Sequence, residues 1–428
     1  MTNGPFESLF AEPLRNGLTR PRGARGRGVR MVNMGEVFAY PHLSDQEMEL
    51  VELSDRERED YLLRPGDLLF ARQSLVWDGA GQCCLVRDFA GEMTFESHLI
   101  RARLDDTAAN SAFFYYFFRS PEGRGYMETI MEQMAAAGIR SSDLARLEIP
   151  VPAKWRQDRA AEVLLLIDDR IEVNRRINRN LDALALSLFR SWFVDFDPVT
   201  ARAEGRMPFG MSNEVAALFP YGFADGIPDG WSSSSLGDLA VNPKRQVKPG
   251  DVAADSPYFG LEHLPRRQIA LDDWGRADKV SSAKYRFDEG AILFGKLRPY
   301  FHKVGVAPVA GICSTDILVV APKDPAHFAF VLGHCSSVEF IDYVDAASGG
   351  TKMPRTDWYT MSCYAVARPP DPVLLAFGVL VHPMLERLRL NTLHNLALKT
   401  LRDALLGPLV SGELRLKPAE REVEAALA

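Results

Sequence analysis

Cysteine is scarce in this 428-residue chain, and the pattern of its five cysteines is not that of a disulfide framework or a zinc site. They form no CxxC pair and have no histidine cluster nearby: Cys83, Cys84, Cys313, Cys335 and Cys363. A reducing compartment fits this usage. The N-terminal segment lacks the apolar run of a signal peptide, and no stretch reaches the roughly 18 apolar residues of a membrane span. The sequence therefore predicts a cytoplasmic protein.

Signatures of catalysis are also missing. No G-x-x-x-x-G-K-[ST] phosphate loop is present, and no Gly-rich turn opens an α/β unit as a methyl-donor site requires. The eight histidines form no H-x-x-x-H pair. Asp168 and Asp169 are adjacent in a predicted helix, so their side chains point about 100° apart, which favours a solvated face over a metal pair. We therefore expect a binding protein that is not an enzyme and holds no metal or cofactor of its own.

Charge is unevenly distributed along the chain, whose formal net charge is −7. Residues 15–30 hold six arginines and no acid, whereas residues 44–60 hold eight acids and two bases. Residues 241–303 hold twelve lysines and arginines against eight acids. The overall charge argues against an indiscriminate nucleic-acid binder, but a local basic face on an acidic body remains compatible with it.

Two long helical segments repeat each other 217 positions apart, at residues 160–193 and 377–410. Both have apolar or asparagine residues at alternating steps of three and four, which is the seam pattern of a coiled coil. The predicted seam comprises Ile171, Asn174, Asn178, Leu181 and Leu188 in the first helix and Leu388, Asn391, Asn395, Leu398 and Leu405 in the second. The two stripes are expected to bury each other.

Asparagine occupies the centre of each stripe. A buried asparagine at a seam position costs stability and fixes register or orientation. The alternative is that these side chains lie at the edge of the seam and stay solvated. The sequence leaves both possibilities open.

The helix repeat is part of a larger duplication, in which each half runs strand, glycine turn, further strands, short helix, glycine loop, proline-ended strand and long helix. The fold class is therefore α+β, with two pseudo-symmetric α/β domains separated by two long helices in an antiparallel coiled coil. We place a first α/β domain at residues 1–152, a long helix at 153–195, a connector and second domain at 196–370, a second long helix at 371–416 and a tail at 417–428 that is expected to fray.

Helix length suggests a spacing function. A helix rises about 1.5 Å per residue, so about 33 residues span roughly 50 Å, or on the order of 15 base pairs of duplex. Two domains with pseudo-twofold symmetry suit two half-sites on DNA, with the helices as the ruler.

With these residues assembled, the chain resembles the DNA-specificity subunits of type I restriction-modification systems. The most specific stretch runs from Ile171 through Asn174 and Asn178 to Leu188, and ends in the motif FVDFDPV at residues 193–199. Further family-like segments lie at Gly230-Trp231, at 236–238 (LGD), at 294–300 (FGKLRPY) and at 348–355 (SGGTKMPR). The resemblance covers nearly the whole chain from about residue 14, although the first half lacks the Gly-Trp and Leu-Gly opening of the second.

The resemblance implies a non-catalytic subunit of a phage-defence complex. Its two target recognition domains would each read one half of a split asymmetric DNA site. It also implies two methyltransferase subunits that bind S-adenosylmethionine, and restriction subunits that use ATP and Mg²⁺ to translocate and cut DNA. The competing hypotheses are a subunit that contributes residues to a composite methyltransferase or nuclease, and a scaffold that binds protein.

The candidate DNA contacts are arginine, lysine and polar side chains near the glycine turns, because Arg can read guanine and Gln adenine in the major groove. In an alternating strand-like run, several residues of 296–303 would share one face. The candidates are Arg72, Gln73, Trp77, Lys296, Arg298, Tyr300, His302, Lys303, Lys352 and Arg355, with Arg25, Arg27 and Arg30 as a further basic group. The alternatives are a solvated edge strand, a packing turn and a mobile basic arm.

The outer faces of the helices offer candidate docking positions for the methyltransferase subunits. These are Arg170, Arg175, Arg176 and Arg179, or apolar neighbours such as Phe189 and Trp192. Exposure of Trp192 and Phe193 would support the second choice.

Overall fold

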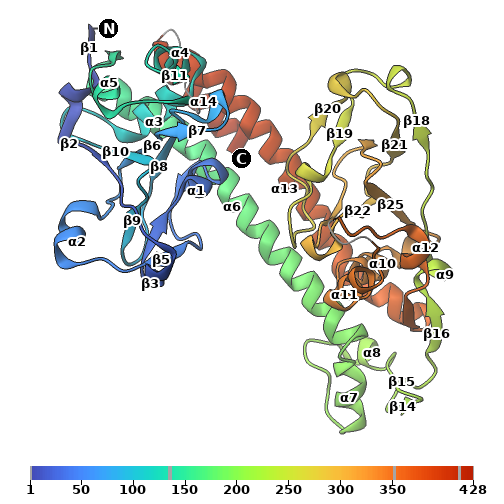
Figure 1. Cartoon of the computed structure of the whole chain (residues 1–428). Coiled ribbons are helices and arrows are strands. Elements are labelled where there is room, and N and C mark those ends of the chain that lie inside the picture. The colour runs from blue at the N-terminus through green and yellow to red at the C-terminus, as the bar shows by residue number, and fades with distance from the viewer. Residues whose placement is uncertain (1, 134–136, 350–352, 413–415, 428) are drawn as a thin grey trace. The chain divides into compact units, whose positions relative to one another are not determined.

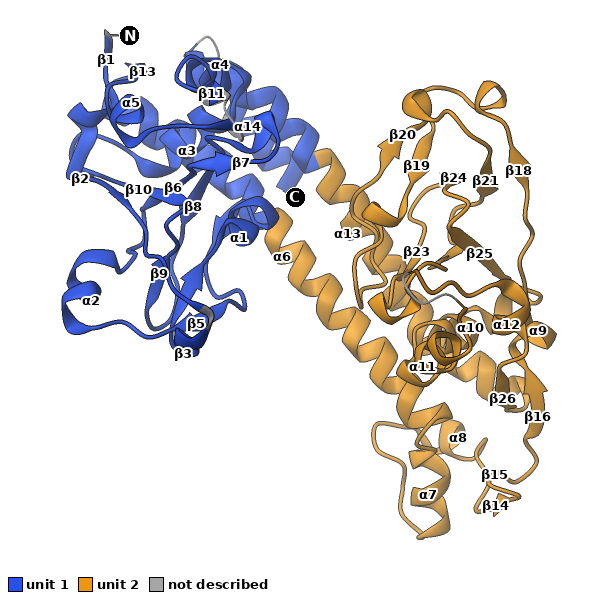
Figure 2. Ribbon diagram, viewed as in Figure 1, with its two compact units in different colours: residues 1–170, 398–428 blue, residues 171–397 orange. Residues whose placement is uncertain are grey.

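A computed structural model describes residues 2–133, 137–349, 353–412 and 416–427 (Figure 1). The chain divides into two compact units (Figure 2). Unit 1 comprises residues 1–170 and 398–428, and unit 2 comprises residues 171–397. Each unit thus contains one α/β domain together with a part of each long helix.

The two long helices are α6 (Lys154–Phe193) and α13 (Asp371–Ser411). Each begins shortly after a strand, β13 (Glu148–Val151) or β26 (Ala365–Arg368), that ends just before proline. Pro152 and Pro370 have no backbone N–H, so they cannot continue a β-ladder. The two helices pack antiparallel. Within unit 2, Asn174 pairs with Asn395 and Asn178 with Asn391, so residue numbers rise along α6 where they fall along α13. The predicted coiled coil is confirmed.

The seam is buried over most of its predicted positions. Ile171, Leu388, Leu398 and Leu405 are at most 4% exposed, while Leu181 and Leu188 are half-buried. All four asparagines are buried, and the amide-to-amide bonds Asn174 Nδ2 to Asn395 Oδ1 and Asn391 Nδ2 to Asn178 Oδ1 both measure 2.8 Å. Burial excludes the solvated-edge alternative and favours a register-fixing role.

Unit 1 is built on a five-stranded sheet with the order β2-β10-β6-β8-β4. Unit 1 also contains a three-stranded sheet with the order β5-β3-β9, and strand β1 pairs with β13. The strands are β1 (Thr2–Pro5), β2 (Phe10–Asn16), β3 (Arg25–Val32), β4 (His42–Leu43), β5 (Glu49–Val51), β6 (Leu68–Ala71), β7 (Gln73–Ser74), β8 (Cys83–Val86), β9 (Met93–Phe95), β10 (Leu99–Leu104), β11 (Glu132–Gln133), β12 (Ala137–Gly138) and β13 (Glu148–Val151). The shorter helices are α1 (Met34–Ala39), α2 (Asp55–Tyr61), α3 (Ser111–Arg119), α4 (Pro121–Glu128), α5 (Ser141–Ala145) and α14 (Leu416–Leu427).

Helix α3 supplies much of the unit 1 core, with every residue from Ala112 to Phe118 buried. Asn110 caps its start by accepting the Phe113 N–H at 3.1 Å. Helix α14 corrects an expectation about the tail: residues 417–428 were predicted to fray, yet Ala419 and Val423 on this helix are buried. Burial of these two side chains stabilises α14 against fraying.

Unit 2 contains a four-stranded sheet, β17-β25-β22-β23, and a five-stranded sheet, β18-β21-β24-β19-β20. The strands are β14 (Phe223–Ala224), β15 (Ile227–Pro228), β16 (Ser232–Ser235), β17 (Ala240–Val241), β18 (Gln246–Val247), β19 (Pro257–Phe259), β20 (Gly275–Arg276), β21 (Lys284–Phe287), β22 (Ile292–Gly295), β23 (Val304–Val306), β24 (Gly311–Cys313), β25 (Ile317–Pro322) and β26 (Ala365–Arg368). The shorter helices are α7 (Asp197–Ala203), α8 (Asn213–Ala216), α9 (Leu236–Leu239), α10 (Phe328–Cys335), α11 (Val338–Ala346) and α12 (Trp358–Ser362).

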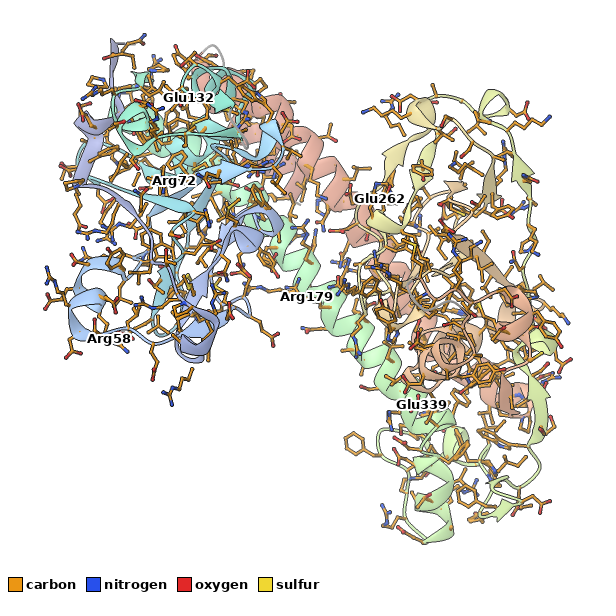
Figure 3. All side chains as sticks on the ribbon, viewed as in Figure 1. Arg58, Arg72, Glu132, Arg179, Glu262 and Glu339 are labelled. Carbon is orange, nitrogen blue, oxygen red and sulfur yellow. The ribbon has the colours of Figure 1, made fainter. Side chains whose placement is uncertain are left out.

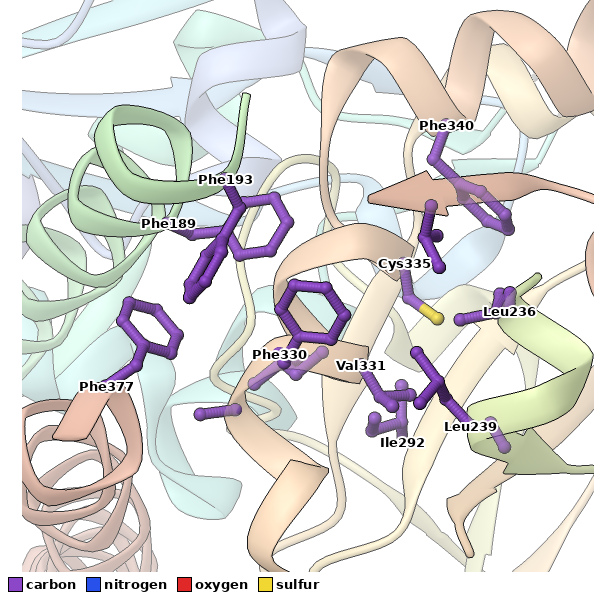
Figure 4. Packing of buried hydrophobic residues seen from close by; sticks show 14 of the residues in the cluster. Phe189, Phe193, Leu236, Leu239, Ile292, Phe330, Val331, Cys335, Phe340 and Phe377 are labelled. Carbon is purple, nitrogen blue, oxygen red and sulfur yellow. The ribbon is translucent and has the colours of Figure 1, made fainter. Parts of the chain in front are cut away.

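The core of unit 2 joins both long helices to the α/β domain (Figure 4). Phe189 and Phe193 of α6 pack with Phe330 of α10 and Phe377 of α13. A side chain at Gly333 would place its Cβ 2.1 Å from the Phe189 ring, so glycine permits this approach. Phe189, Trp192 and Phe193 are at most 4% exposed, so the exposure that would have supported docking at Phe189 and Trp192 is absent.

The two units repeat one topology. In unit 1 the neighbours are β10-β6-β8, and in unit 2 they are β25-β22-β23, with antiparallel pairing throughout. Each set is followed by two short helices, α3 with α4 and α10 with α11, and then by the proline-ended strand β13 or β26. The predicted duplication is confirmed at the level of strand order.

A buried polar network in unit 1 corrects another expectation. Asp168, predicted to lie on a solvated face, is buried on α6. Its carboxylate accepts hydrogen bonds from Arg402 Nη1 of α13 at 2.8 Å and from the Tyr116 hydroxyl of α3 at 2.6 Å. Although burial disfavours the charge on Arg402, the adjacent Asp168 raises the pKa of this guanidinium. The network ties the C-terminal part of α13 into unit 1.

Candidate nucleic-acid interface

Equivalent loops follow the central strands β6 and β22 of the two units. Loop A, residues 72–79, follows β6, and loop B, residues 296–303, follows β22. Each is joined to the glycine-containing segment that precedes the proline-ended strand: Gln73 pairs with Gly138, and Leu297 bridges to Arg355. The duplication thus puts most of the candidate DNA contacts at the same topological position in both units.

Loop A is held by side-chain hydrogen bonds from Arg124 and exposes two apolar side chains. The Arg124 guanidinium donates to the carbonyls of Ala80 at 2.6 Å and Trp77 at 3.1 Å. Gly79 lies so close to Ser74 that a Cβ there would be 2.2 Å from the hydroxyl. Leu75 and Val76 protrude, at 93% and 64% exposed. A rigid loop that exposes two aliphatic side chains is available for contact with a partner molecule.

The candidate polar residues of loop A are Arg72 and Gln73. Arg72, labelled in Figure 3, is half-buried, and its side chain forms no ion pair within the described part of the chain. Gln73 is exposed, and Trp77 is partly exposed at the start of a 3-10 turn, Trp77–Gly79. The structure therefore leaves these side chains accessible.

Loop B is a compact turn, so the prediction of a strand-like run with alternating faces is wrong. Strand β22 ends at Gly295, and a 3-10 turn occupies Pro299–Phe301. Arg298 and His302, on either side of that turn, have left-handed backbone conformations with φ of 52° and 51°. Such φ values are uncommon for residues other than glycine, and they reverse the chain sharply at each end of the turn.

The turn sorts the loop B candidates into two groups. Lys296 and Arg298 are half-buried and Tyr300 is 48% exposed. His302 is buried, its Nε2 lies 3.0 Å from the Ser336 carbonyl, and burial lowers its pKa. The Lys303 ammonium donates to the Leu261 carbonyl, and burial lowers its pKa too. His302 and Lys303 therefore hold the loop in place, and neither presents its polar group to a partner in this conformation.

Two cationic side chains that the sequence reasoning missed lie beside loop B. Arg266 is exposed, and its guanidinium carbon lies 3.9 Å from the centre of the Phe301 ring. Arg267 is exposed as well, and its backbone N–H donates to the His302 carbonyl at 2.9 Å. Neither side chain has a carboxylate partner among the residues that the structure describes. The adjacent arginines of the segment LPRRQ (264–268) were the available signal.

The second predicted patch of unit 2 comprises Lys352 and Arg355. Arg355 is exposed and forms an ion pair with Asp316 at 3.4 Å. Lys352 lies outside the described residues. Arg355 remains a candidate beside loop B, through its bridge to Leu297.

The arginine-rich segment of unit 1 is neutralised by the acidic segment of the same unit. Strand β3 (Arg25–Val32) pairs with β5 (Glu49–Val51), which excludes a mobile basic arm in this region. The ion pairs are Arg15–Asp60 at 3.1 Å, Arg20–Glu57 at 2.6 Å, Arg25–Glu49, Arg27–Glu52 at 2.8 Å and Arg30–Asp45 at 3.1 Å. A hydrogen bond from Arg20 is the largest cause that lowers the pKa of Glu57 to about 2. These arginines have internal partners, which reduces their attraction for DNA.

The helix arginines proposed for docking are likewise mostly paired. Arg175 lies 3.1 Å from Asp272, and both Arg176 and Arg179 contact Glu172. Within the described residues, no group of three or more His, Cys, Asp or Glu side chains could hold a metal ion. In the same part of the chain no helix is long and apolar enough to cross a membrane.

Comparison with known proteins gives one consistent result, although no family model matches the chain. It is 26% identical over 321 residues to the type I restriction enzyme MjaIX specificity subunit of Methanocaldococcus jannaschii, covering 72% of this chain and 70% of that protein. It is 24% identical over 442 residues to the HindI specificity subunit of Haemophilus influenzae, covering 90% and 94%. The EcoKI specificity subunit of Escherichia coli is 29% identical over 220 residues, which cover 50% and 47%.

The fold agrees with these relatives. The crystal structure of a type I restriction-modification S subunit from M. genitalium superposes with a TM-score of 0.55 at 15% identity, covering 95% of both chains. The architecture defines a class: duplicated α/β domains combined with two long antiparallel helices. Within that class, the chain belongs to the specificity subunits of type I restriction-modification systems, the non-catalytic part of such enzymes.

Proposed function

We propose that this chain recognises a bipartite, asymmetric target on double-stranded DNA and directs methyltransferase and restriction subunits to it. Each unit reads one half-site through its loop A or loop B. The observation that carries the proposal is the duplication: the same strand order places a loop with candidate DNA contacts after its central strand in both units. Two similar domains with different loop sequences suit a target whose two halves differ.

The loops differ in the contacts they offer. In loop A, Gln73 suits a hydrogen-bonded contact to adenine, Arg72 suits guanine or a phosphate, and Leu75 and Val76 suit the methyl group of thymine. In loop B, Lys296, Arg298 and Tyr300 are joined by Arg355 and by the missed Arg266 and Arg267, with Lys352 still a candidate from the sequence. Phosphate contacts from the long cationic side chains would position the duplex, and the groups within the loops would read base edges.

The long helices serve as the spacer between the half-sites. Helices α6 and α13 have 40 and 41 residues, and both contribute to both units. Inserting one turn, about 5.4 Å, in each helix should lengthen the gap of the recognised motif by one or two base pairs and leave both half-sites unchanged. Altered half-sites with an unchanged gap would contradict the proposed spacer role of the helices.

Partner subunits supply the chemistry in this proposal. Methyltransferase subunits bring S-adenosylmethionine, and restriction subunits bring ATP and Mg²⁺. The helices still expose apolar residues on which such subunits can dock, and these differ from the buried aromatic residues first predicted. They are Leu166, Val173 and Leu184 on α6 and Leu375, Val379, Leu380, Leu390 and Leu396 on α13.

The decisive experiment is methylome sequencing of the host with and without this gene, with the methyltransferase gene expressed. Loss of one bipartite methylated motif is the expected result, and it also identifies the target. An unchanged methylome would contradict the proposal. Binding of S-adenosylmethionine by the isolated chain would instead favour a composite methyltransferase.

A further inference from the structure

Backbone strain is concentrated around loop B. Six described residues other than glycine have a positive φ, and three of them meet here: Arg267, Arg298 and His302, at 55°, 52° and 51°. Each such conformation is unfavourable by itself and persists only where surrounding contacts determine it. Strain of this kind clusters at ligand-binding sites, so its position calls for a functional explanation.

Hydrogen bonds hold this strained turn from three sides. The Arg298 N–H donates to the Pro354 carbonyl at 2.8 Å, and the Thr356 N–H donates to the Lys296 carbonyl at 3.0 Å. From the opposite segment, the Arg267 N–H donates to the His302 carbonyl. The buried His302 ring also contacts the Ser336 carbonyl, with its Nε2 at 3.0 Å from the oxygen. The backbone at Arg298 is therefore fixed before any ligand arrives.

The Arg298 side chain is more constrained than its cationic neighbours. It is half-buried, with its guanidinium carbon 5.8 Å from the Phe301 ring centre, and it has no carboxylate partner among the described residues. Arg266 packs on the same ring but is exposed, and Arg267 is exposed as well. A planar fork of donors on a fixed backbone suits bidentate contact with a base edge, whereas exposed long side chains suit phosphates.

We propose that Arg298 is the specificity-determining residue of unit 2 and reads a guanine through the major groove, while Arg266 and Arg267 clamp the phosphate backbone. The assignment rests on the proposed function and adds a division of labour among the arginines of one site. It makes the two kinds of substitution distinguishable. Loss of a base reader relaxes one position of the target, whereas loss of a phosphate clamp weakens binding to all sequences alike.

The test is methylome sequencing of cells that express the full chain with its methyltransferase subunits, in wild-type, Arg298→Lys, Arg298→Gln and Arg266→Gln forms. Arg298→Lys keeps the charge but loses the fork, so it should methylate a motif that is degenerate at one G·C position of one half-site. The expected loss of discrimination at that position is roughly 5- to 150-fold. Arg266→Gln should methylate the wild-type motif less completely.

A binding measurement keeps the test decisive if a variant methylates poorly. Wild-type and Arg298→Lys complexes are compared on the wild-type motif and on duplexes with that one base pair replaced. Equal discrimination by both complexes would overturn the assignment. A uniform loss on all duplexes by the Arg298→Gln complex, with a smaller salt dependence, would make Arg298 another phosphate contact and overturn the assignment as well. Failure of the wild-type chain to specify any motif would instead contradict the proposed function itself.

Discussion

Unit 1 contains the densest run of arginines in the chain, yet these arginines are paired with carboxylates, whereas three arginines at loop B of unit 2 are not, within the part of the chain that the structure describes. In unit 1, Arg20, Arg25 and Arg30 pair with carboxylates of the 44–60 segment. In unit 2, Arg266, Arg267 and Arg298 have no such partners among the described residues. The difference shows that the density of arginine along a sequence does not measure the charge that a partner meets, because tertiary pairing decides it.

The units also use different buried polar groups to hold the long helices. Unit 1 uses charge, through the Asp168–Arg402 pair with Tyr116. Unit 2 uses neutral amides, through Asn174 with Asn395 and Asn178 with Asn391. Removing one partner from a buried ion pair leaves an uncompensated charge, which costs far more than leaving an amide unpaired. The two halves of the helix pair should therefore differ in their sensitivity to substitution.

The largest effect is expected from Arg402→Ala in unit 1. It leaves the Asp168 carboxylate buried without its cation, so the free energy of unfolding of unit 1 should fall by about 3–5 kcal/mol. Chemical denaturation, with hydrogen exchange of residues 398–411 to locate the loss, measures it. The double variant Asp168→Leu/Arg402→Met is the matched control and should recover much of the stability. A small effect of Arg402→Ala would contradict the comparison.

The next effect concerns DNA binding by the complex with methyltransferase subunits. Arg266→Ala/Arg267→Ala should weaken binding by about 10- to 30-fold at physiological salt and reduce the slope of log K against log salt by about two. Arg25→Ala/Arg27→Ala removes the same number of cations from paired positions, and a smaller loss is expected. An equal or larger loss from the unit 1 variant would show that pairing does not decide availability.

A smaller effect is expected from Asp182 of unit 2, which is buried on α6 and accepts the Ile269 N–H at 2.9 Å. Burial raises its pKa to about 6. Because this folded-state pKa lies above the unfolded value of 3.8, the folded chain holds more protons in the window between them. The free energy of unfolding should therefore fall as pH rises from about 4 to about 6, and stay level above.

Asp182→Asn removes that titration and keeps an acceptor for the backbone N–H. The wild-type chain should lose about 1–2 kcal/mol relative to the variant between about pH 4.5 and pH 7.5. Denaturant titrations of both proteins at these two pH values measure the difference. Parallel pH profiles would show that Asp182 does not titrate in this window.

The smallest effect is expected for the half-exposed pair Arg175–Asp272 in unit 2. Arg175→Ala should lower the free energy of unfolding by less than about 1 kcal/mol, because solvent screens both charges. Comparing the loss of stability in Arg175→Ala with that in Arg402→Ala separates the effect of burial from the effect of ion pairing. A loss as large as that of Arg402→Ala would remove burial as the explanation.

Periodicity and repetition in the sequence predicted the two long helices and the order of elements in each half. These features are local, because side-chain periodicity reports which face of an element is buried. The site was predicted less well. Loop B was read as a strand because the sequence of 296–303 contains no signal for two left-handed residues, and Arg266 was missed because it reaches the site from a different segment.

The sequence by itself determined the duplicated plan, the antiparallel helices and the family, since these depend on patterns that recur within one chain. Only the tertiary structure decided which charges remain available. It placed the acids of 44–60 on the arginines of 15–30, buried Asp168 against Arg402 and turned His302 and Lys303 inward. The physical reason is that an ion pair forms between side chains that are close in space, and separation along the chain does not report that distance.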